Sequence, residues 1–195
     1  PGKGLGIYEH NGKKIAVMNF MGRVDINILT ENPFIMVSEM VEELQEKVDI
    51  IIIDFHAEAT AEKIAMARYL DGKITILFGT HTHVQTGDEQ ILPNGTGYIT
   101  DLGMTGPKNS VIGMDIQASI KRFETTLPEK YKLAEGECIF NAVIFEVDDS
   151  TNKITRIERI YIKKFLFLNI NNSVEACDEN SKNFQKVLDK RYHIL

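Results

Sequence analysis

The sequence predicts an α/β protein, because two short apolar runs with the character of buried strands alternate with segments of helical periodicity. The runs cover residues 48–55 and 74–79, and both are nearly continuous in apolar character and rich in β-branched residues. Runs of this kind are typical of strands that are covered on both faces of a parallel sheet. A helical segment precedes each run, which gives the helix–strand–helix–strand order of an α/β sheet.

The start of the chain predicts a β-hairpin. Asn11-Gly12 separates two alternating stretches at 7–10 and 14–20. An Asn-Gly pair favours the tight turn whose twist matches two antiparallel strands, so in this setting it is a strong hairpin signal.

Two helices are expected next, one before each apolar run. Asn32 is suited to cap the first helix, with Pro33 at its first position, and apolar residues then recur at helical spacing until Lys47 ends the helix. The second helix is expected over 60–70, and Gly72 lies at its C-terminal stop. We expect Ile64, Ala67 and the pair Tyr69–Leu70 to face partly inward.

The segment 79–115 is expected to be a long structured loop region. It holds nine glycines and prolines, and only 97–101 has the pattern of a strand. Loop regions of this length beside a rigid sheet are where functional residues tend to lie. A short helix is expected over 115–123.

The rest of the chain predicts a second hairpin followed by a divergent tail. Residues 138–147 and 154–162 alternate in the manner of two antiparallel strands joined by a polar turn. We expect 1–162 to form one domain and 163–195 to be a tail, partly disordered, with a short helix near 184–192.

Composition excludes several classes of function. With 195 residues, 43% hydrophobic and 26% charged, the chain has the profile of a globular protein with a substantial core. Its net charge of −6 argues against an extended nucleic-acid surface. No apolar run reaches the length of a membrane span. The two cysteines, Cys138 and Cys177, form no CxxC motif, so reduced thiols in a cytoplasm are expected.

Three of the five histidines follow the two apolar runs directly. His56 ends the first run, and His81 and His83 come just after the second. Side chains at the carboxyl ends of neighbouring parallel strands converge on the crevice where α/β folds place ligands. Because neutral imidazole is the commonest side-chain metal ligand, the sequence predicts a metal site at this edge of the sheet.

The nearby carboxylates leave alternatives open. Asp54 points with His56 on a strand and can orient its ring, or simply accept hydrogen bonds from the loop. Glu58 can be a further ligand, but a helix-start role beside the N-terminal dipole is favoured. Asp101 is a structural or ring-orienting candidate, while His10 and His193 are expected to be exposed and idle. Three imidazoles alone resemble a mononuclear zinc site, whereas a two-metal site needs a bridging carboxylate.

Four strings resemble one known family. Residues 54–63, 69–72, 79–86 (GTHTHVQT) and 98–107 (YITDLGMTGP) are similar to the YmdB-type metallophosphoesterases, bacterial cytoplasmic enzymes of the calcineurin-like superfamily with cyclic-nucleotide phosphodiesterase activity. The resemblance covers about residues 1–162. It implies a sandwich of two mixed sheets flanked by helices around a dinuclear iron or manganese centre.

The resemblance also implies roles for the histidines. His56 and His81 correspond to ligands of one metal ion, and His83 to a ligand of the other. The family's anionic ligands and its general-acid histidine belong to an N-terminal segment, so this chain is expected to be the C-terminal portion of such an enzyme. The implied substrate is a 2′,3′-cyclic nucleotide, hydrolysed to a 3′-nucleotide, or another phosphodiester. The expected protein partner is the missing segment or a second copy, with no membrane partner.

Three hypotheses follow. The first is a phosphodiesterase fragment that is inactive without its missing segment. The second is a mononuclear zinc hydrolase complete in itself, which three imidazoles would allow. The third is a truncated, non-catalytic interaction domain.

Overall fold

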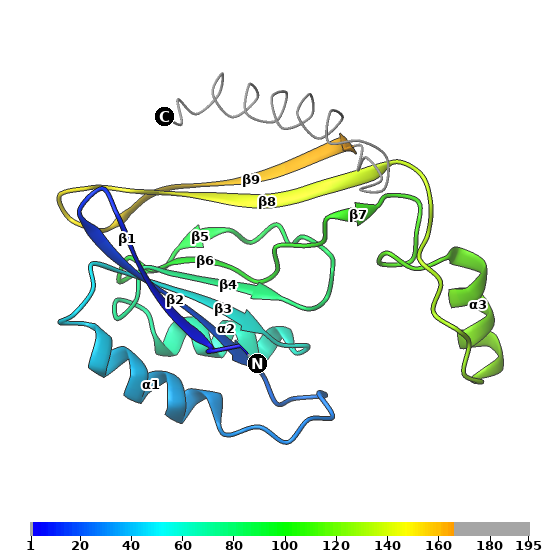
Figure 1. Cartoon of the computed structure of the whole chain (residues 1–195), viewed down its shortest axis with the longest axis horizontal. Coiled ribbons are helices and arrows are strands. Elements are labelled where there is room, and N and C mark those ends of the chain that lie inside the picture. Colours follow the sequence, from blue (N-terminus) through cyan, green and yellow to red (C-terminus); the bar gives the residue numbers. More distant parts are fainter. Residues whose placement is uncertain (1, 166–195) are drawn as a thin grey trace.

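A computed structural model describes residues 2–165 and shows the expected α/β architecture as a sandwich (Figure 1). The larger sheet has six strands in the order β1-β2-β3-β4-β6-β5, and the smaller has three in the order β7-β8-β9. Helices α1 and α2 lie on one side of the larger sheet, and the long β8–β9 hairpin crosses its other side (Figure 1). From residue 166 onward, the expected tail lies outside the described residues.

The strands and helices have the following bounds, in chain order: β1 Leu5–His10, β2 Lys13–Met21, α1 Pro33–Leu44, β3 Ile50–His56, α2 Thr60–Tyr69, β4 Ile76–Thr80, β5 Gln90–Ile91, β6 Gly97–Ile99, β7 Gly106–Pro107, α3 Ile116–Thr125, β8 Cys138–Val147 and β9 Ile154–Phe165. Both predicted hairpins are confirmed, as β1–β2 and β8–β9. Strands β2, β3, β4 and β6 pair in parallel.

Alternation along β3 places its apolar residues in the core and its polar residues on the opposite face. Ile51, Ile53 and Phe55 are buried and belong to the main hydrophobic core, which also receives the inner faces of α1 and α2. Successive side chains of a strand point to opposite faces. Asp54 and His56 therefore lie on the face turned away from that core, where they are half-buried.

The predicted start of α1 is confirmed. Asn32 Oδ1 accepts a hydrogen bond from the Phe34 amide at 3.0 Å, and Pro33 occupies the first turn, where its missing N–H costs nothing. The helix ends at Leu44 rather than at Lys47. The three residues beyond it form a tight turn in which the Lys47 amide donates to the Leu44 carbonyl.

The two-residue strands β5 and β7 were not predicted. Their pairing partners lie elsewhere in the chain, since β5 pairs with β6 and Gly106 of β7 pairs with Ile139 of β8. So short a strand has no periodicity of its own, and it forms only because a neighbouring strand supplies hydrogen bonds. The predicted strand at 97–101 is correspondingly shorter, at Gly97–Ile99.

The turn between β8 and β9 is closed by Asp148. Its Oδ1 accepts hydrogen bonds from the amide and hydroxyl groups of both Ser150 and Thr151. These bonds lower the pKa of Asp148 from 3.8 to about 2, and the hydrogen bond from the Ser150 hydroxyl has the largest effect. All of them favour the ionised carboxylate.

This turn should therefore loosen only in strong acid. A depressed carboxyl pKa contributes stability that is fully present above the unfolded value, near 3.8, and is lost as the pH falls through about 2. The protection of the Ser150 and Thr151 amides, measured as exchange relative to an unstructured peptide at the same pH, should be present at pH 4 and fall toward pH 2, and in Asp148→Ala it should be lost at both. Equal exchange in the two proteins at pH 4 would contradict this prediction.

Candidate metal centre

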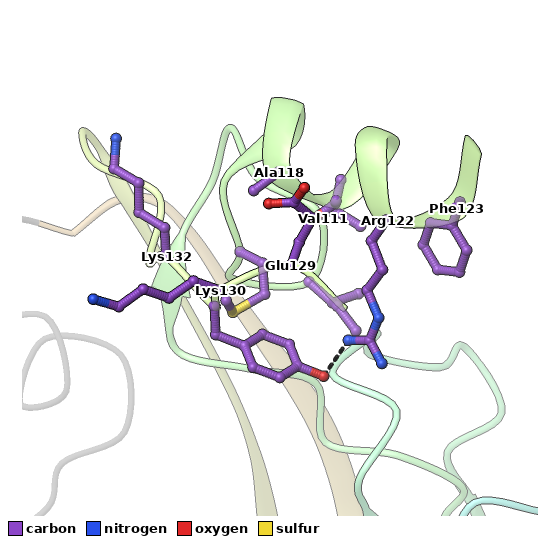
Figure 2. A pocket seen from close by; sticks show the side chains of 11 residues that line it. Val111, Ala118, Arg122, Phe123, Glu129, Lys130 and Lys132 are labelled. Atoms are coloured by element: carbon purple, nitrogen blue, oxygen red, sulfur yellow. Dashed lines mark hydrogen bonds between the residues drawn. The ribbon is translucent and has the colours of Figure 1, made fainter. Parts of the chain in front are cut away.

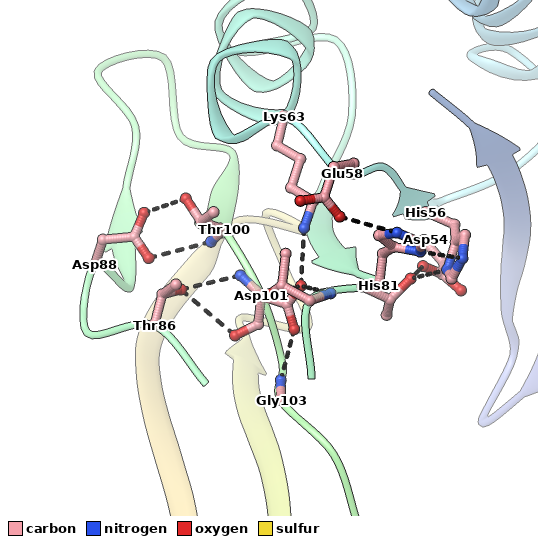
Figure 3. A network of polar contacts seen from close by, with 12 residues as sticks. Asp54, His56, Glu58, Lys63, His81, Thr86, Asp88, Thr100, Asp101 and Gly103 are labelled. Carbon is pink, nitrogen blue, oxygen red and sulfur yellow. Dashed lines mark hydrogen bonds and ion pairs between the residues drawn. The ribbon is translucent and has the colours of Figure 1, made fainter. Parts of the chain in front are cut away.

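His56 and His81 meet at the carboxyl edge of the parallel strands. His56 ends β3 and pairs in register with Thr80, the last residue of β4, so His81 is the first residue beyond that strand. The Nε2 atom of His56 lies 3.0 Å from Nδ1 of His81, and the two rings are nearly perpendicular, at 86° (Figure 3). The structure thus brings these two predicted site residues together.

A chain of hydrogen bonds fixes the orientation of His56. The Thr80 hydroxyl donates its single hydrogen to Asp54 Oδ1 at 2.7 Å, and Asn19 Nδ2 donates to the other oxygen of Asp54 at 2.8 Å. Since the Thr80 hydrogen is used, His56 Nδ1, 3.0 Å from the same hydroxyl, must be the donor in that contact. In the neutral ring this leaves a lone pair on His56 Nε2, directed at His81.

The surroundings of His56 favour its neutral form. Burial lowers the pKa of His56 below the usual 6.5, and the adjacent His81 lowers it further, while Asp54 acts in the opposite direction. A neutral imidazole is the form that binds a metal ion. Because Asp54 accepts the Thr80 hydroxyl hydrogen and Thr80 in turn contacts His56 Nδ1, Asp54 orients the His56 ring through Thr80. This agrees with the ring-orienting role, one of the two alternatives for Asp54.

Glu58 contacts His81 and does not begin the helix. Its Oε2 lies 3.0 Å from His81 Nε2, with both side chains partly exposed (Figure 3). The favoured interpretation of Glu58 as a helix-start residue is therefore wrong: α2 begins at Thr60, with Ala59 at its N-cap. His81, whose φ is 111°, lies next to Glu58, so the Glu58 carboxylate has a histidine partner ahead of the helix.

His83 faces a different neighbour. Its Nδ1 lies 2.9 Å from the carbonyl oxygen of Ile112. A carbonyl only accepts, so Nδ1 carries the hydrogen, and Nε2 holds the lone pair when the ring is neutral. His83 and Ile112 both have positive φ, 66° and 47°, values that few non-glycine residues adopt.

The three histidines do not form a single cluster of donors. Within residues 2–165, no group of three or more His, Cys, Asp or Glu side chains is arranged to hold one metal ion. His56 and His81 make a pair, whereas the hydrogen-bond partner of His83 is the Ile112 carbonyl. Their roles as metal ligands remain a prediction.

A buried ion pair supports the loop that carries His81 and His83. Lys63 Nζ lies 2.8 Å from Asp101 Oδ2, and both side chains are almost fully buried. The same oxygen accepts from the amide and hydroxyl of Thr82, while Oδ1 accepts from the Gly103 amide (Figure 3). Asp101 therefore ties the middle of the His-Thr-His loop to helix α2.

Burial alone would raise the pKa of Asp101. The hydrogen bonds from Lys63, Gly103 and Thr82 outweigh it and hold that pKa below the ordinary 3.8. The sequence indicated Asp101 as a candidate but gave no sign of Lys63, because a lysine inside a helix is normally solvated.

His10 is not part of the site. His10 is exposed at the end of β1, as predicted, and His193 lies outside the described residues.

No helix within the described range is long and apolar enough to cross a membrane.

The chain is similar in sequence and in fold to known proteins. A 2′,3′-cyclic-nucleotide 2′-phosphodiesterase of Bacillus subtilis is 48% identical over 162 residues, which are 83% of this chain and 61% of that protein. A phosphatase from Mycoplasma pneumoniae superposes with a TM-score of 0.79 at 40% identity, covering 84% of this chain and 58% of that one. A hypothetical protein from Thermus thermophilus also gives 0.79, at 37% identity, covering 84% and 63%.

This chain thus spans about six-tenths of the length of the relatives it matches. Residues 1–160, most of the chain, match the family described as YmdB-like protein. The chain therefore belongs to the YmdB-like protein family.

Proposed function

We propose that this chain contributes His56, His81 and His83 to a dinuclear centre, of iron or manganese, that hydrolyses 2′,3′-cyclic nucleotides to 3′-nucleotides. The observation that carries the proposal is the contact between His56 and His81, two imidazoles that approach nitrogen to nitrogen at the edge of a parallel sheet. The substrate class comes from the name of the Bacillus subtilis relative.

The donor set fits a metal ion. Two nitrogens bound to one cation at about 2.1 Å, with angles near 90–110°, lie about 3.0–3.4 Å apart. His56 Nε2 and His81 Nδ1 are 3.0 Å apart, so small ring movements would let both bind one ion. Nδ1 of His56 and Nδ1 of His83 are engaged with Thr80 and Ile112, which leaves Nε2 of each ring as the ligating atom.

Divalent cations, when bound, neutralise charge on phosphoryl oxygens and acidify water. The chain's own residues hold and aim the ligands. The Asn19–Asp54–Thr80 chain of hydrogen bonds fixes the His56 ring, and the Asp101 carboxylate fixes the loop between His81 and His83. Such outer hydrogen bonds set ring orientation and ligand basicity. Glu58 contacts Nε2 of His81, the ring nitrogen that faces away from His56, and restrains the ring from that side.

The proposal requires further ligands. Two cations about 3.5–4 Å apart repel strongly without a bridging carboxylate, and within residues 2–165 no acidic group completes the histidine set. We propose that these anionic ligands and the general acid come from a segment that the relatives possess and this chain does not match. A self-contained mononuclear zinc hydrolase ranks lower, because it needs three donors on one ion.

Complementation tests the proposal. The chain alone, given manganese or iron, should bind at most one ion weakly and show little or no hydrolysis of a 2′,3′-cyclic nucleotide. Supplying the part of the Bacillus subtilis relative that this chain does not cover, as a fusion or a second polypeptide, should restore turnover and two ions per complex. Robust metal-dependent turnover by the chain alone would favour the zinc hydrolase. Failure of every combination would favour the non-catalytic interaction domain.

A further inference from the structure

Residues 108–137, which we call the arm, connect β7 to β8 and carry α3 away from the two sheets (Figure 1). None of the ten residues of α3 is buried. The arm is nevertheless ordered by its own backbone contacts: the Asp115 amide donates to the Lys132 carbonyl, and the Ala134 amide donates to the Gly113 carbonyl. It is thus a small folded projection rather than part of the core.

The root of the arm touches the candidate metal centre. Ile112 accepts the hydrogen bond from His83 Nδ1 at 2.9 Å. Ile112 is β-branched and yet has a φ of 47°. Strained backbone of this kind persists where the surrounding structure demands it, often at ligand sites. The strain and the histidine contact therefore coincide at one residue.

Ile112 also lines a cavity of about 140 Å³ inside the arm, the arm pocket (Figure 2). Its lining is mostly apolar and includes Met114, Phe123 and Tyr131. The Arg122 guanidinium lies 5.1 Å from the centre of the Tyr131 ring and donates to the Tyr131 hydroxyl. An apolar pocket with a few placed polar groups is the usual form of a small-molecule site.

The chemistry of this pocket fits a nucleobase. Planar bases stack on aromatic side chains and on guanidinium planes, largely irrespective of base identity. Phe123 and Tyr131 are large and well exposed, at 78% and 68%, so their rings are accessible to a ligand. The acidic Glu129 in the lining is neutralised by an ion pair with Lys121. Arg122, Lys130 and Lys132 give the lining a net positive charge, which suits a nucleotide.

We propose that the arm pocket binds the base of the nucleotide whose phosphodiester is hydrolysed beside His83. This inference rests on the proposed function, and it assigns to Tyr131 and Arg122 the recognition of the base. Ile112 connects the two parts of the site, because it is one of the residues that line the pocket and its carbonyl accepts the hydrogen bond from His83.

The test is a binding titration of the full chain with adenosine 3′-monophosphate and, separately, with inorganic phosphate, followed by amide NMR. The nucleotide should shift amides of residues 111–132, and Tyr131→Ala should raise its Kd roughly tenfold. Tyr131→Phe keeps the ring and should bind nearly as well as the unaltered chain. Tyr161→Ala removes a similarly exposed tyrosine from β9 and should leave the Kd unchanged.

Three results would overturn the inference: an unchanged nucleotide Kd in Tyr131→Ala, nucleotide-induced shifts that avoid the arm, or equal effects of nucleotide and inorganic phosphate on it. Arm shifts that follow protein concentration instead of nucleotide would show that a second copy of the chain covers this surface. The two proposals fail separately. If the arm binds the nucleotide but the complemented protein does not hydrolyse it, the proposed phosphodiesterase function is contradicted. If the complemented protein hydrolyses the nucleotide but Tyr131→Ala leaves its Kd unaltered, the proposed base pocket is contradicted.

Discussion

Replacing Lys63 by methionine should lower the free energy of unfolding by about 3–5 kcal/mol. Methionine retains most of the apolar volume of lysine, so the core of α2 stays filled. What is lost is the ammonium group 2.8 Å from Asp101 Oδ2, in a place where both side chains are almost fully buried. Removing one partner of such a pair leaves a buried charge without its counter-ion, and that accounts for most of the cost.

The matched control is Lys121→Met. Lys121 lies on the exposed side of α3 and pairs with Glu129, with 63% of its side chain accessible. Exposed ion pairs contribute only about 0–1 kcal/mol. Denaturant unfolding of the two variants should therefore separate them clearly. Indistinguishable unfolding midpoints, with unchanged slopes, would show that the Lys63–Asp101 pair does not stabilise the fold.

The difference between Lys63→Met and the unaltered protein should depend on pH. The hydrogen bonds to Asp101 outweigh the effect of its burial and hold its pKa below 3.8 in the folded state. A depressed carboxyl pKa contributes stability above the unfolded value, near 3.8, and that stability is lost as the pH falls through the folded value. The two proteins should thus converge below pH 3.8 and differ fully at neutral pH.

Helix α2 shows why its buried lysine could not be predicted. The sequence led us to place Ile64, Ala67 and Tyr69–Leu70 inward, but Ile64 is 41% and Tyr69 is 43% exposed. The buried face is Lys63, Met66, Ala67 and Leu70, at the spacing of one helical stripe. A lysine in that stripe weakened the apolar pattern. Only the fold, which places Asp101 opposite, makes its burial tolerable.

The histidines at the strand ends could be predicted, whereas their mutual arrangement could not. Apolar runs reveal where strands end, and the parallel pairing of β3 with β4 then brings His56 to Thr80 and next to His81. The positive φ values at His81, His83 and Ile112 leave no trace in the sequence, because none of these residues is a glycine. At two of these positions the side chains make the contacts described above, His81 with Glu58 and His83 with Ile112 of the arm.

Replacing His81 by alanine should abolish hydrolysis in the complemented protein, with a fall in turnover of roughly 10²–10⁴-fold. The estimate follows from the several kcal/mol of transition-state stabilisation that a bound cation supplies, at about 1.4 kcal/mol for each factor of ten. His81 is proposed to share one ion with His56, whose Nε2 lies 3.0 Å from His81 Nδ1. The metal content should fall from two ions to one.

Two further variants make this prediction specific. His83→Ala should also remove one ion, but it should leave the ring contacts between His56 and His81 unaltered, because His83 is held by Ile112. His10→Ala removes an exposed histidine at the end of β1 and should change neither the metal content nor the turnover. Turnover and metal content measured on the same samples decide the matter. Retention of both ions and most of the activity in His81→Ala would show that the pair at the strand ends is not a metal site, since a ligand cannot be removed from a two-metal centre without loss of charge stabilisation at phosphorus.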